Sequence, residues 1–190
     1  MYDLPSIILA SASPRRAELL RAAGMAFEIH PAHVDENVHE GEAPDAYVLR
    51  VAEAKARVIA ARFPDRVVLG ADTTVVLEQT ILGKPRDHEH ARGMLRMLSG
   101  RVHEVLSGVC VCKLAPSSCD IRLARTSVEF SPLTDEEIAW YAASGEPMDK
   151  AGAYAIQGLA SRFVTRIEGS YSNVVGLPVA LVCEMLLPRT

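Results

Sequence analysis

The sequence lacks any hydrophobic run near the length of about 20 residues that a transmembrane helix requires. It also lacks an excess of positive charge, since 20 Lys and Arg are outnumbered by 24 Asp and Glu and the net charge is −4. The N-terminal stretch carries the acidic Asp3 and only a short apolar segment, unlike a secretory signal. We therefore expect a cytoplasmic protein that binds neither a membrane nor a nucleic acid polymer.

Cysteine is scarce, with four residues in the chain, at positions 110, 112, 119 and 183. The spacing of Cys110, Cys112 and Cys119 matches no common structural zinc site. Because Cys110 and Cys112 lie two apart in an expected strand, both should point to one face of a sheet. We expect reduced cysteines that pack as small apolar groups.

The composition is that of an ordinary folded protein, with 49% hydrophobic and 23% charged residues. The 190 residues contain no repeat, low-complexity tract or linker, which predicts a single domain over residues 1–190. Periodicity and capping signals predict helices at 14–23, 44–62 and 88–98, one beginning at the capping box Thr134–Glu137, and one opened by Pro178. Strands are expected at 6–10, 25–31, 67–77, 103–114, 121–130 and 162–167, with a loop over 33–43 and turns at 78–80 and 115–118. Mixed strands and helices indicate the α/β class.

The turn at residues 11–16 is the first place where polar residues break the packing pattern. Ser13 suits an N-cap and Pro14 a first helical position, which puts Arg15 and Arg16 in the first helical turn. Two cations at the positive end of a helix dipole are unfavourable unless an anion binds there. The turn therefore indicates either a phosphate site or two solvated arginines.

The second such place is Lys55. The helix around it carries an apolar stripe at helical spacing, formed by Val48, Val51, Ala52, Val58 and Ile59. Lys55 lies four residues from two members of the stripe and so belongs to the same face. A lysine there must either extend its ammonium group to water or meet a negative charge.

The third place is Asp72, which interrupts the apolar run VVLGADTTVVL. An aspartate is costly to bury unpaired in a strand, and Gly70 beside it permits the close approach of a ligand or backbone. Asp72 is therefore either a turn residue or a carboxylate that holds a metal or activates water. Lys84 in a Gly-Lys-Pro turn, and the loop acids Asp35 and Glu36, are weaker signals.

Taken together, these motifs resemble the Maf family of nucleotide pyrophosphatases over nearly the whole chain. The matching segments, in order, are SASPRR at 11–16, EAKA at 53–56, GADT at 70–73, GKP at 83–85, LSGRVHEVLSGV at 98–109, SGEPMDKAGAYAIQG at 144–158 and GSYSNVVGLP at 169–178. The resemblance implies an α/β fold with an elongated mixed sheet, flanking helices and two lobes around a central cleft, similar to the inosine triphosphate pyrophosphatases.

The resemblance also implies an activity. Members of the family hydrolyse a nucleoside triphosphate between the α and β phosphates with a divalent cation, Mg²⁺ or Mn²⁺. The loop DKAGAYAIQG at 149–158 has the form of the dTTP/UTP branch, in which Arg15, Thr73 and Gln157 fall on base-selecting positions. Two alternatives stay open, a non-catalytic regulator of cell division and a pyrophosphatase for 7-methyl-GTP or other purine nucleotides.

The expected mechanism gives each matched residue a role. Asp72 is the general base, and Asp72 and Glu36 are the metal ligands. The triphosphate is neutralised by four cationic side chains and receives a neutral donor from one hydroxyl: Arg15, Arg16, Lys55, Lys84 and Ser13. Gln157 reads a pyrimidine edge with its amide. The sequence does not decide between a monomer and a homodimer.

Overall fold

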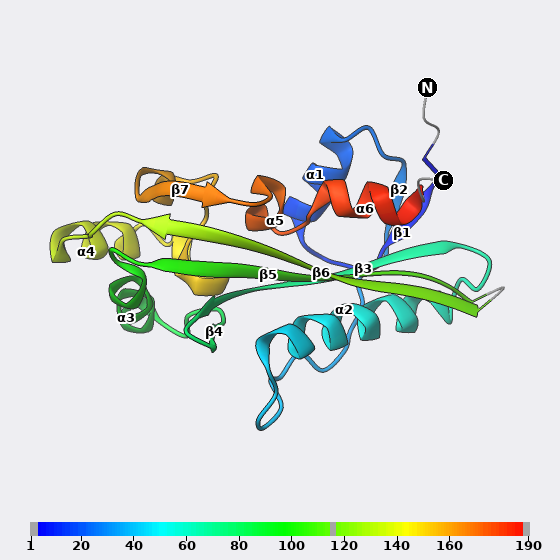
Figure 1. Ribbon diagram of the computed structural model, residues 1–190, viewed down its shortest axis with the longest axis horizontal. Helices are drawn as coiled ribbons and strands as arrows, with labels where there is room; N and C mark the ends of the chain where they lie inside the picture. Colours follow the sequence, from blue (N-terminus) through cyan, green and yellow to red (C-terminus); the bar gives the residue numbers. More distant parts are fainter. Residues whose placement is uncertain (1–3, 115–116, 188–190) are drawn as a thin grey trace. The chain divides into compact units, whose positions relative to one another are not determined.

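The computed structural model describes residues 4–114 and 117–187 (Figure 1). Its elements in chain order are β1 (Ile7–Leu9), α1 (Pro14–Ala22), β2 (Phe27–Ile29), α2 (Pro44–Ala60), β3 (Val67–Leu77), β4 (Thr80–Leu82), α3 (His88–Leu98), β5 (Val102–Leu114), β6 (Ser117–Phe130), α4 (Asp135–Ala143), the 3₁₀ turns η1 (Glu146–Asp149), η2 (Ala151–Ala153) and η3 (Leu159–Arg162), β7 (Val164–Glu168), α5 (Tyr171–Val175) and α6 (Val179–Leu186). Within the described ranges, no helix is long and apolar enough to cross a membrane.

The strands form one seven-stranded sheet in the order β2-β1-β3-β5-β6-β7, with β4 paired to β3. β1 runs parallel to β2 and β3, whereas β4 is antiparallel to β3 and β7 is antiparallel to β6. The sheet is therefore mixed and flanked by helices, which confirms the α/β class expected from the sequence.

The chain divides into two compact units. The first comprises Met1–Thr73, Ser107–Ala124 and Gly176–Thr190, and the second comprises Thr74–Leu106 and Arg125–Val175. β3, β5 and β6 each contribute residues to both units. The single domain and the central cleft expected from the sequence stay predictions.

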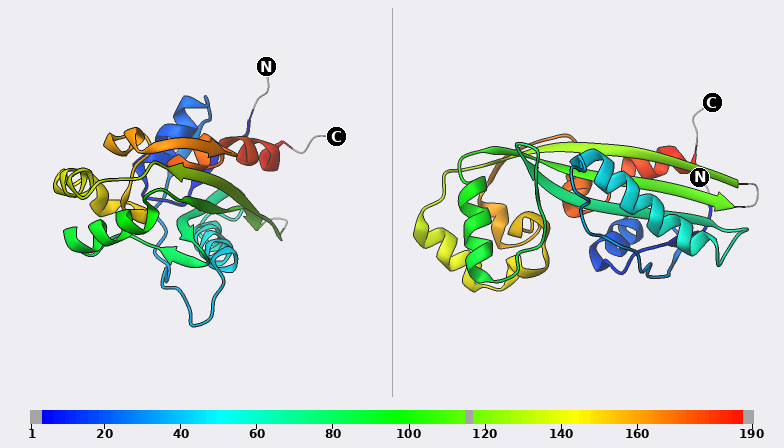
Figure 2. Two further views of the ribbon diagram at one scale, coloured as in Figure 1. Left: turned by 60° about the vertical axis from the view of Figure 1, so that its left-hand side comes forward. Right: turned by 90° about the horizontal axis from the view of Figure 1, so that it is seen from below.

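In the first unit, helices cover both faces of the sheet: α1 and α6 lie on one face and α2 on the other (Figures 1 and 2). Alternation along β1 explains this, because successive side chains of a strand point to opposite faces. Ile7 and Leu9 pack in a core with residues of α1 and α6. Ile8 packs in a separate core with residues of α2.

Two glycines let α2 lie directly against the sheet backbone. A Cβ atom on Gly70 would lie 2.3 Å from the Ala52 carbonyl oxygen, and one on Gly108 would lie 2.1 Å from that of Val48. Such distances are far inside van der Waals contact, so only glycine fits at either position. The expected stripe on α2 is narrower than predicted, because Val58 is 41% exposed at its edge.

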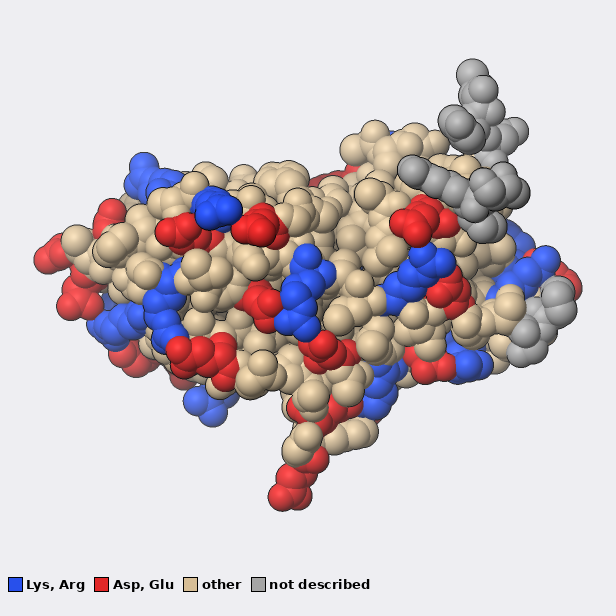
Figure 3. All heavy atoms as spheres, in the orientation of Figure 1, with Lys and Arg blue, Asp and Glu red and all other residues tan. Residues whose placement is uncertain are grey.

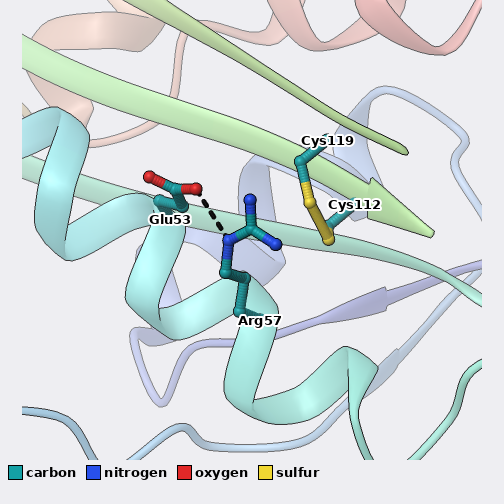
Figure 4. The surroundings of a disulfide bond; sticks show 4 residues. All are labelled: Glu53, Arg57, Cys112 and Cys119. Carbon is teal, nitrogen blue, oxygen red and sulfur yellow. Dashed lines mark hydrogen bonds and ion pairs between the residues drawn. A yellow bond between two sulfur atoms is a disulfide. The ribbon is translucent and has the colours of Figure 1, made fainter. Parts of the chain in front are cut away.

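The cysteine prediction is wrong for one pair. Cys112 and Cys119 form a disulfide with a Cα–Cα distance of 4.2 Å, close to the Glu53–Arg57 ion pair of α2 (Figure 4). The two cysteines are seven residues apart, and pairing of β5 with β6, which cysteine spacing alone does not reveal, brings them together. Cys110 does behave as expected, since burial raises the pKa of its thiol to about 12.

In the second unit, α3 packs against α4 and the 3₁₀ turns η1 and η2 (Figure 2). The Thr134 capping box and the Asp87 cap are both present as predicted. The aromatic core of this unit contains His103, which is 1% exposed and stacks edge-on against Phe130 and Tyr154.

His103 is buried as a neutral imidazole. Its Nε2 lies 2.9 Å from the Tyr154 hydroxyl, and burial raises the pKa of that phenol, so the hydrogen bond joins two neutral groups. The other ring nitrogen, Nδ1, has no hydrogen-bond partner among the described residues. Burial lowers the pKa of His103 to about 4.

This burial predicts a loss of stability in acid. The unfolded chain protonates His103 near pH 6.5 whereas the folded protein resists until about pH 4, so the unfolded state binds more protons in between. The free energy of unfolding should therefore fall by up to about 3 kcal/mol from pH 7 to pH 4 through this group. Urea titrations at four pH values should show that the free energy of unfolding depends less on pH in His103→Phe than in the wild-type protein. The same pH dependence in both proteins would contradict the assignment.

Candidate functional site

The centre of the site in the first unit is a lysine between two carboxylates. Lys55 Nζ lies 2.8 Å from Asp72 Oδ1 and 2.9 Å from Glu36 Oε1. The Lys55 and Asp72 side chains are 8% and 9% exposed, whereas Glu36 is 52% exposed. Lys55 therefore meets negative charge instead of extending to water. The two carboxylates predicted to act together, Asp72 and Glu36, both form ion pairs with its ammonium group.

The loop that carries Glu36 is fastened to α2. Arg50 donates to the Asn37 carbonyl oxygen at 2.8 Å and forms a two-point ion pair with Glu42 at 2.6 and 2.8 Å. The Tyr47 hydroxyl donates to the Glu36 carbonyl oxygen at 3.1 Å. Hydrogen bonds from Arg50 lower the pKa of Glu42 to about 2. Acidic side chains gather on this projecting loop (Figure 3), so its attachment fixes where that charge lies.

Arg16 joins its own turn to two segments that are distant in the sequence. Its Nε donates to the Gly176 carbonyl oxygen at 2.9 Å, its Nη1 to Ser11 Oγ at 3.1 Å, and its Nη2 to Thr73 Oγ1 at 3.4 Å. The solvated alternative is therefore wrong for Arg16, which is 8% exposed. Its guanidinium is built into the protein, so any phosphate contact would be made by a fixed group.

Burial lowers the pKa of Arg16, and the negative charges of Asp72 and Glu36 oppose that shift. Arg15 lies next to it and is half-buried. Ser13 occupies the N-cap position of α1, but its side chain makes no capping hydrogen bond. The first turn of α1 therefore carries two cationic groups, one of them fixed, at the end of a helix that favours anions.

The hydroxyl of Thr73 is fully engaged within the first unit. Thr73 Oγ1 lies 2.7 Å from Ser107 Oγ and donates to the Gly176 carbonyl oxygen at 3.1 Å. A hydroxyl has one hydrogen to donate and two lone pairs, and here Ser107 and Arg16 supply the donors for both. A role of Thr73 in base selection would therefore act through its methyl group or through the residues that it holds. Sequence reasoning missed Ser107 and Gly176, although both lie in motifs that match the family.

Two predicted substrate residues lie in the second unit. Lys84 and Gln157 are both exposed. The backbone N–H of Gly152 donates to the Gly83 carbonyl oxygen at 3.1 Å, which ties the Gly-Lys-Pro turn to the 149–158 loop. The structure thus gathers the remaining predicted residues in the first unit: Ser13, Arg15, Arg16, Glu36, Lys55, Asp72 and Thr73.

Asp72 and Glu36 are the carboxylates of the site that could hold a metal ion. Among the described residues, no group of three or more His, Cys, Asp or Glu side chains lies close enough together to hold a metal ion. Asp72 and Glu36 nevertheless lie within 2.9 Å of one ammonium group. Mg²⁺ is commonly held by one or two carboxylates plus substrate phosphates, so this pair fits a cation that arrives with a nucleotide.

The chain is similar to known proteins over most of its length. A family model described as Maf-like protein matches residues 6–188. A protein of Anaeromyxobacter sp. (strain Fw109-5) named dTTP/UTP pyrophosphatase is 55% identical over 183 residues, covering 95% of this chain and 87% of that protein. One of Koribacter versatilis (strain Ellin345) with the same name is 54% identical, covering 95% of this chain and 92% of its own. The solved Ham1 protein of Staphylococcus aureus superimposes with a TM-score of 0.53 at 13% identity, covering 95% of this chain and 99% of that chain, a likeness of fold.

Proposed function

This chain belongs to the Maf-like protein family, and we propose that it is a nucleoside triphosphate pyrophosphatase that hydrolyses dTTP and UTP to the monophosphate and pyrophosphate. Relatives more than 50% identical over most of the chain carry the name of that activity. The observation that carries the proposal is the buried Asp72 carboxylate held at 2.8 Å by Lys55, because burying charge is costly and a positioned carboxylate is what a general base requires.

Asp72 is the general base in this proposal. Its carboxylate would accept the proton of the water that attacks the α phosphorus. Lys55 holds the carboxylate in place and offsets half of the combined charge of Asp72 and Glu36. The fixed geometry matters because a base works only within hydrogen-bond reach of the proton that it removes.

The cationic groups neutralise the triphosphate and the pyrophosphate that leaves. Arg15 and Arg16 at the start of α1, together with Lys84, supply positive charge. This charge stabilises the transition state more strongly as negative charge develops on the leaving group. Ser13 and the N–H groups of the first turn of α1 add neutral donors. Gln157, with one acceptor and two donors on its amide, reads the pyrimidine edge.

We propose Mg²⁺ or Mn²⁺ as the cofactor, held by Asp72 and Glu36. When bound, the ion would supply Lewis-acid polarisation of the phosphoryl oxygens and ease ionisation of water. The proximity of the two carboxylates to one ammonium group supports this assignment. The cytoplasmic location stays a prediction, and the oligomeric state stays open.

A panel of nucleoside triphosphates tests the function. Pyrophosphate release with Mg²⁺ should be greatest for dTTP and UTP and should cease when EDTA removes the cation. Hydrolysis confined to 7-methyl-GTP or other purine nucleotides would replace the substrate class while keeping the enzyme. No hydrolysis of any nucleotide with either Mg²⁺ or Mn²⁺ would instead favour the non-catalytic regulator.

A further inference from the structure

Glu146 makes three hydrogen bonds that no role in catalysis explains. It begins η1, which two residues separate from the end of α4, within the second unit. Its Oε1 accepts from the Tyr141 hydroxyl at 2.8 Å and from the Ala160 backbone N–H at 3.4 Å, and its Oε2 accepts from the Leu159 N–H at 3.0 Å. One carboxylate from a neighbouring segment therefore accepts hydrogen bonds from two backbone N–H groups in the first turn of η3.

Tyr141 extends this contact to the other side of the loop. Its side chain is fully buried, and its hydroxyl accepts from the Ala155 backbone N–H at 3.2 Å. Burial raises the pKa of Tyr141, and the hydrogen bond to Glu146 adds to this shift. The phenol therefore stays protonated and donates a hydrogen bond to the carboxylate. The chain is thus fixed at residue 155 and again at residues 159 and 160.

Residues 156–158 lie between these fixed points, with Gln157 at their centre. A Cβ atom on Gly158 would lie 2.2 to 2.5 Å from the Glu146 carboxylate atoms. The backbone therefore passes directly against the carboxylate, one residue after the exposed Gln157. The backbone is thus held by hydrogen bonds on both sides of Gln157 and lies against the Glu146 carboxylate at Gly158. It therefore has little freedom to move the Cα atom from which the Gln157 side chain extends.

We propose that Glu146 and Tyr141 are positioning residues for Gln157, and that they thereby set the preference of the enzyme for pyrimidine nucleotides. They form a clamp, by which we mean the hydrogen bonds from Glu146 and Tyr141 to residues 155, 159 and 160. The clamp holds the backbone on both sides of Gln157, and so fixes the point from which its amide would reach the pyrimidine of a nucleotide. This inference rests on the proposed function, since it assigns a cause to the substrate preference of that site.

The clamp matters energetically because a carboxylate accepting backbone N–H groups forms stronger hydrogen bonds than a neutral acceptor. Glu146→Ala leaves two N–H groups and one phenol without their acceptor, and the loop then gains alternative conformations. A displacement of about 1 Å in a positioned group can lower catalytic efficiency on the order of 100-fold. We expect kcat/KM for dTTP relative to dGTP to fall at least about tenfold in this variant.

The experiment compares four single variants of the protein and one double variant. Glu146→Ala removes the clamp, and Tyr141→Phe removes only the hydroxyl while keeping the ring. Glu137→Ala is the matched control, because Glu137 also accepts a backbone N–H, from Thr134 at 2.8 Å, but in the capping box at the start of α4. Only the first two should lose selectivity, and Gln157→Ala should lose it without a further loss when combined with Glu146→Ala.

Hydrogen exchange gives a readout that needs no activity. The amides of residues 159 and 160 should exchange at least about tenfold faster in Glu146→Ala than in the wild-type protein or Glu137→Ala. Unchanged amide exchange would overturn the clamp whether or not the protein hydrolyses nucleotides. Absence of hydrolysis would overturn the proposed function, independently of the exchange result. Faster exchange with unchanged selectivity, or an equal loss of selectivity in Glu137→Ala, would also overturn the proposal.

Discussion

An Asp72→Asn variant should hydrolyse dTTP and UTP at least about 100-fold more slowly than the wild-type enzyme, because a positioned general base contributes that much. Asparagine has nearly the same shape, and its oxygen can still accept the hydrogen bond that Lys55 donates at 2.8 Å. What the substitution removes is the negative charge and the ability to take a proton. Steady-state pyrophosphate release with saturating Mg²⁺ should therefore show a fall in kcat larger than any rise in KM.

The variant should remain folded, because Lys55 keeps its ion pair with Glu36 at 2.9 Å. The thermal midpoint of Asp72→Asn shows whether folding is retained. Asp120→Asn is a suitable control, since Asp120 is a carboxylate of the same unit that is 43% exposed and paired with Arg122 at 2.8 Å. Turnover by folded Asp72→Asn within a few-fold of wild type, or an equal loss in Asp120→Asn, would show that Asp72 is not the base.

The residues that break local packing rules were the ones that the sequence identified best. Helical spacing alone places Lys55 on the buried face of α2, and the structure confirms that burial. The interrupted apolar run likewise marks Asp72, which is 6% exposed in β3. A one-dimensional pattern shows that a charge is buried, but it cannot show what the charge meets, because the partners are separated by 17 residues.

What the sequence could not predict depends on contacts between distant segments. The hydrogen bonds of Arg16 reach across 57 and 160 residues, and no local signal marks Thr73 or Gly176 as their partners. Pairing of the sheet likewise starts β6 at Ser117 instead of residue 121, while part of the expected 115–118 turn lies outside the described residues. The short helix α5 and the 3₁₀ turns were missed because elements of five residues or fewer leave little periodicity to detect.

The second large effect is expected from Gly108→Ala, which adds one methyl group where β5 meets α2. The new Cβ would lie 2.1 Å from the Val48 carbonyl oxygen and 2.8 Å from the Leu49 backbone nitrogen. These are backbone atoms of a helix, which cannot rotate away, so the whole helix must shift. Overpacking of this kind costs about 3 kcal/mol. The thermal midpoint should therefore fall by roughly 10 °C.

The same shift should reach the active site, because α2 carries Lys55 and its contact with Asp72 depends on how closely the helix lies against the sheet. We expect roughly tenfold lower kcat in Gly108→Ala at a temperature where the variant is still folded. Gly93→Ala is the matched control: it lies in the interior of α3, and a Cβ there would meet nothing within 4 Å. That variant should gain up to about 1 kcal/mol from helix propensity and keep full activity. If Gly108→Ala were as stable and active as Gly93→Ala, close packing of α2 would not be what positions Lys55.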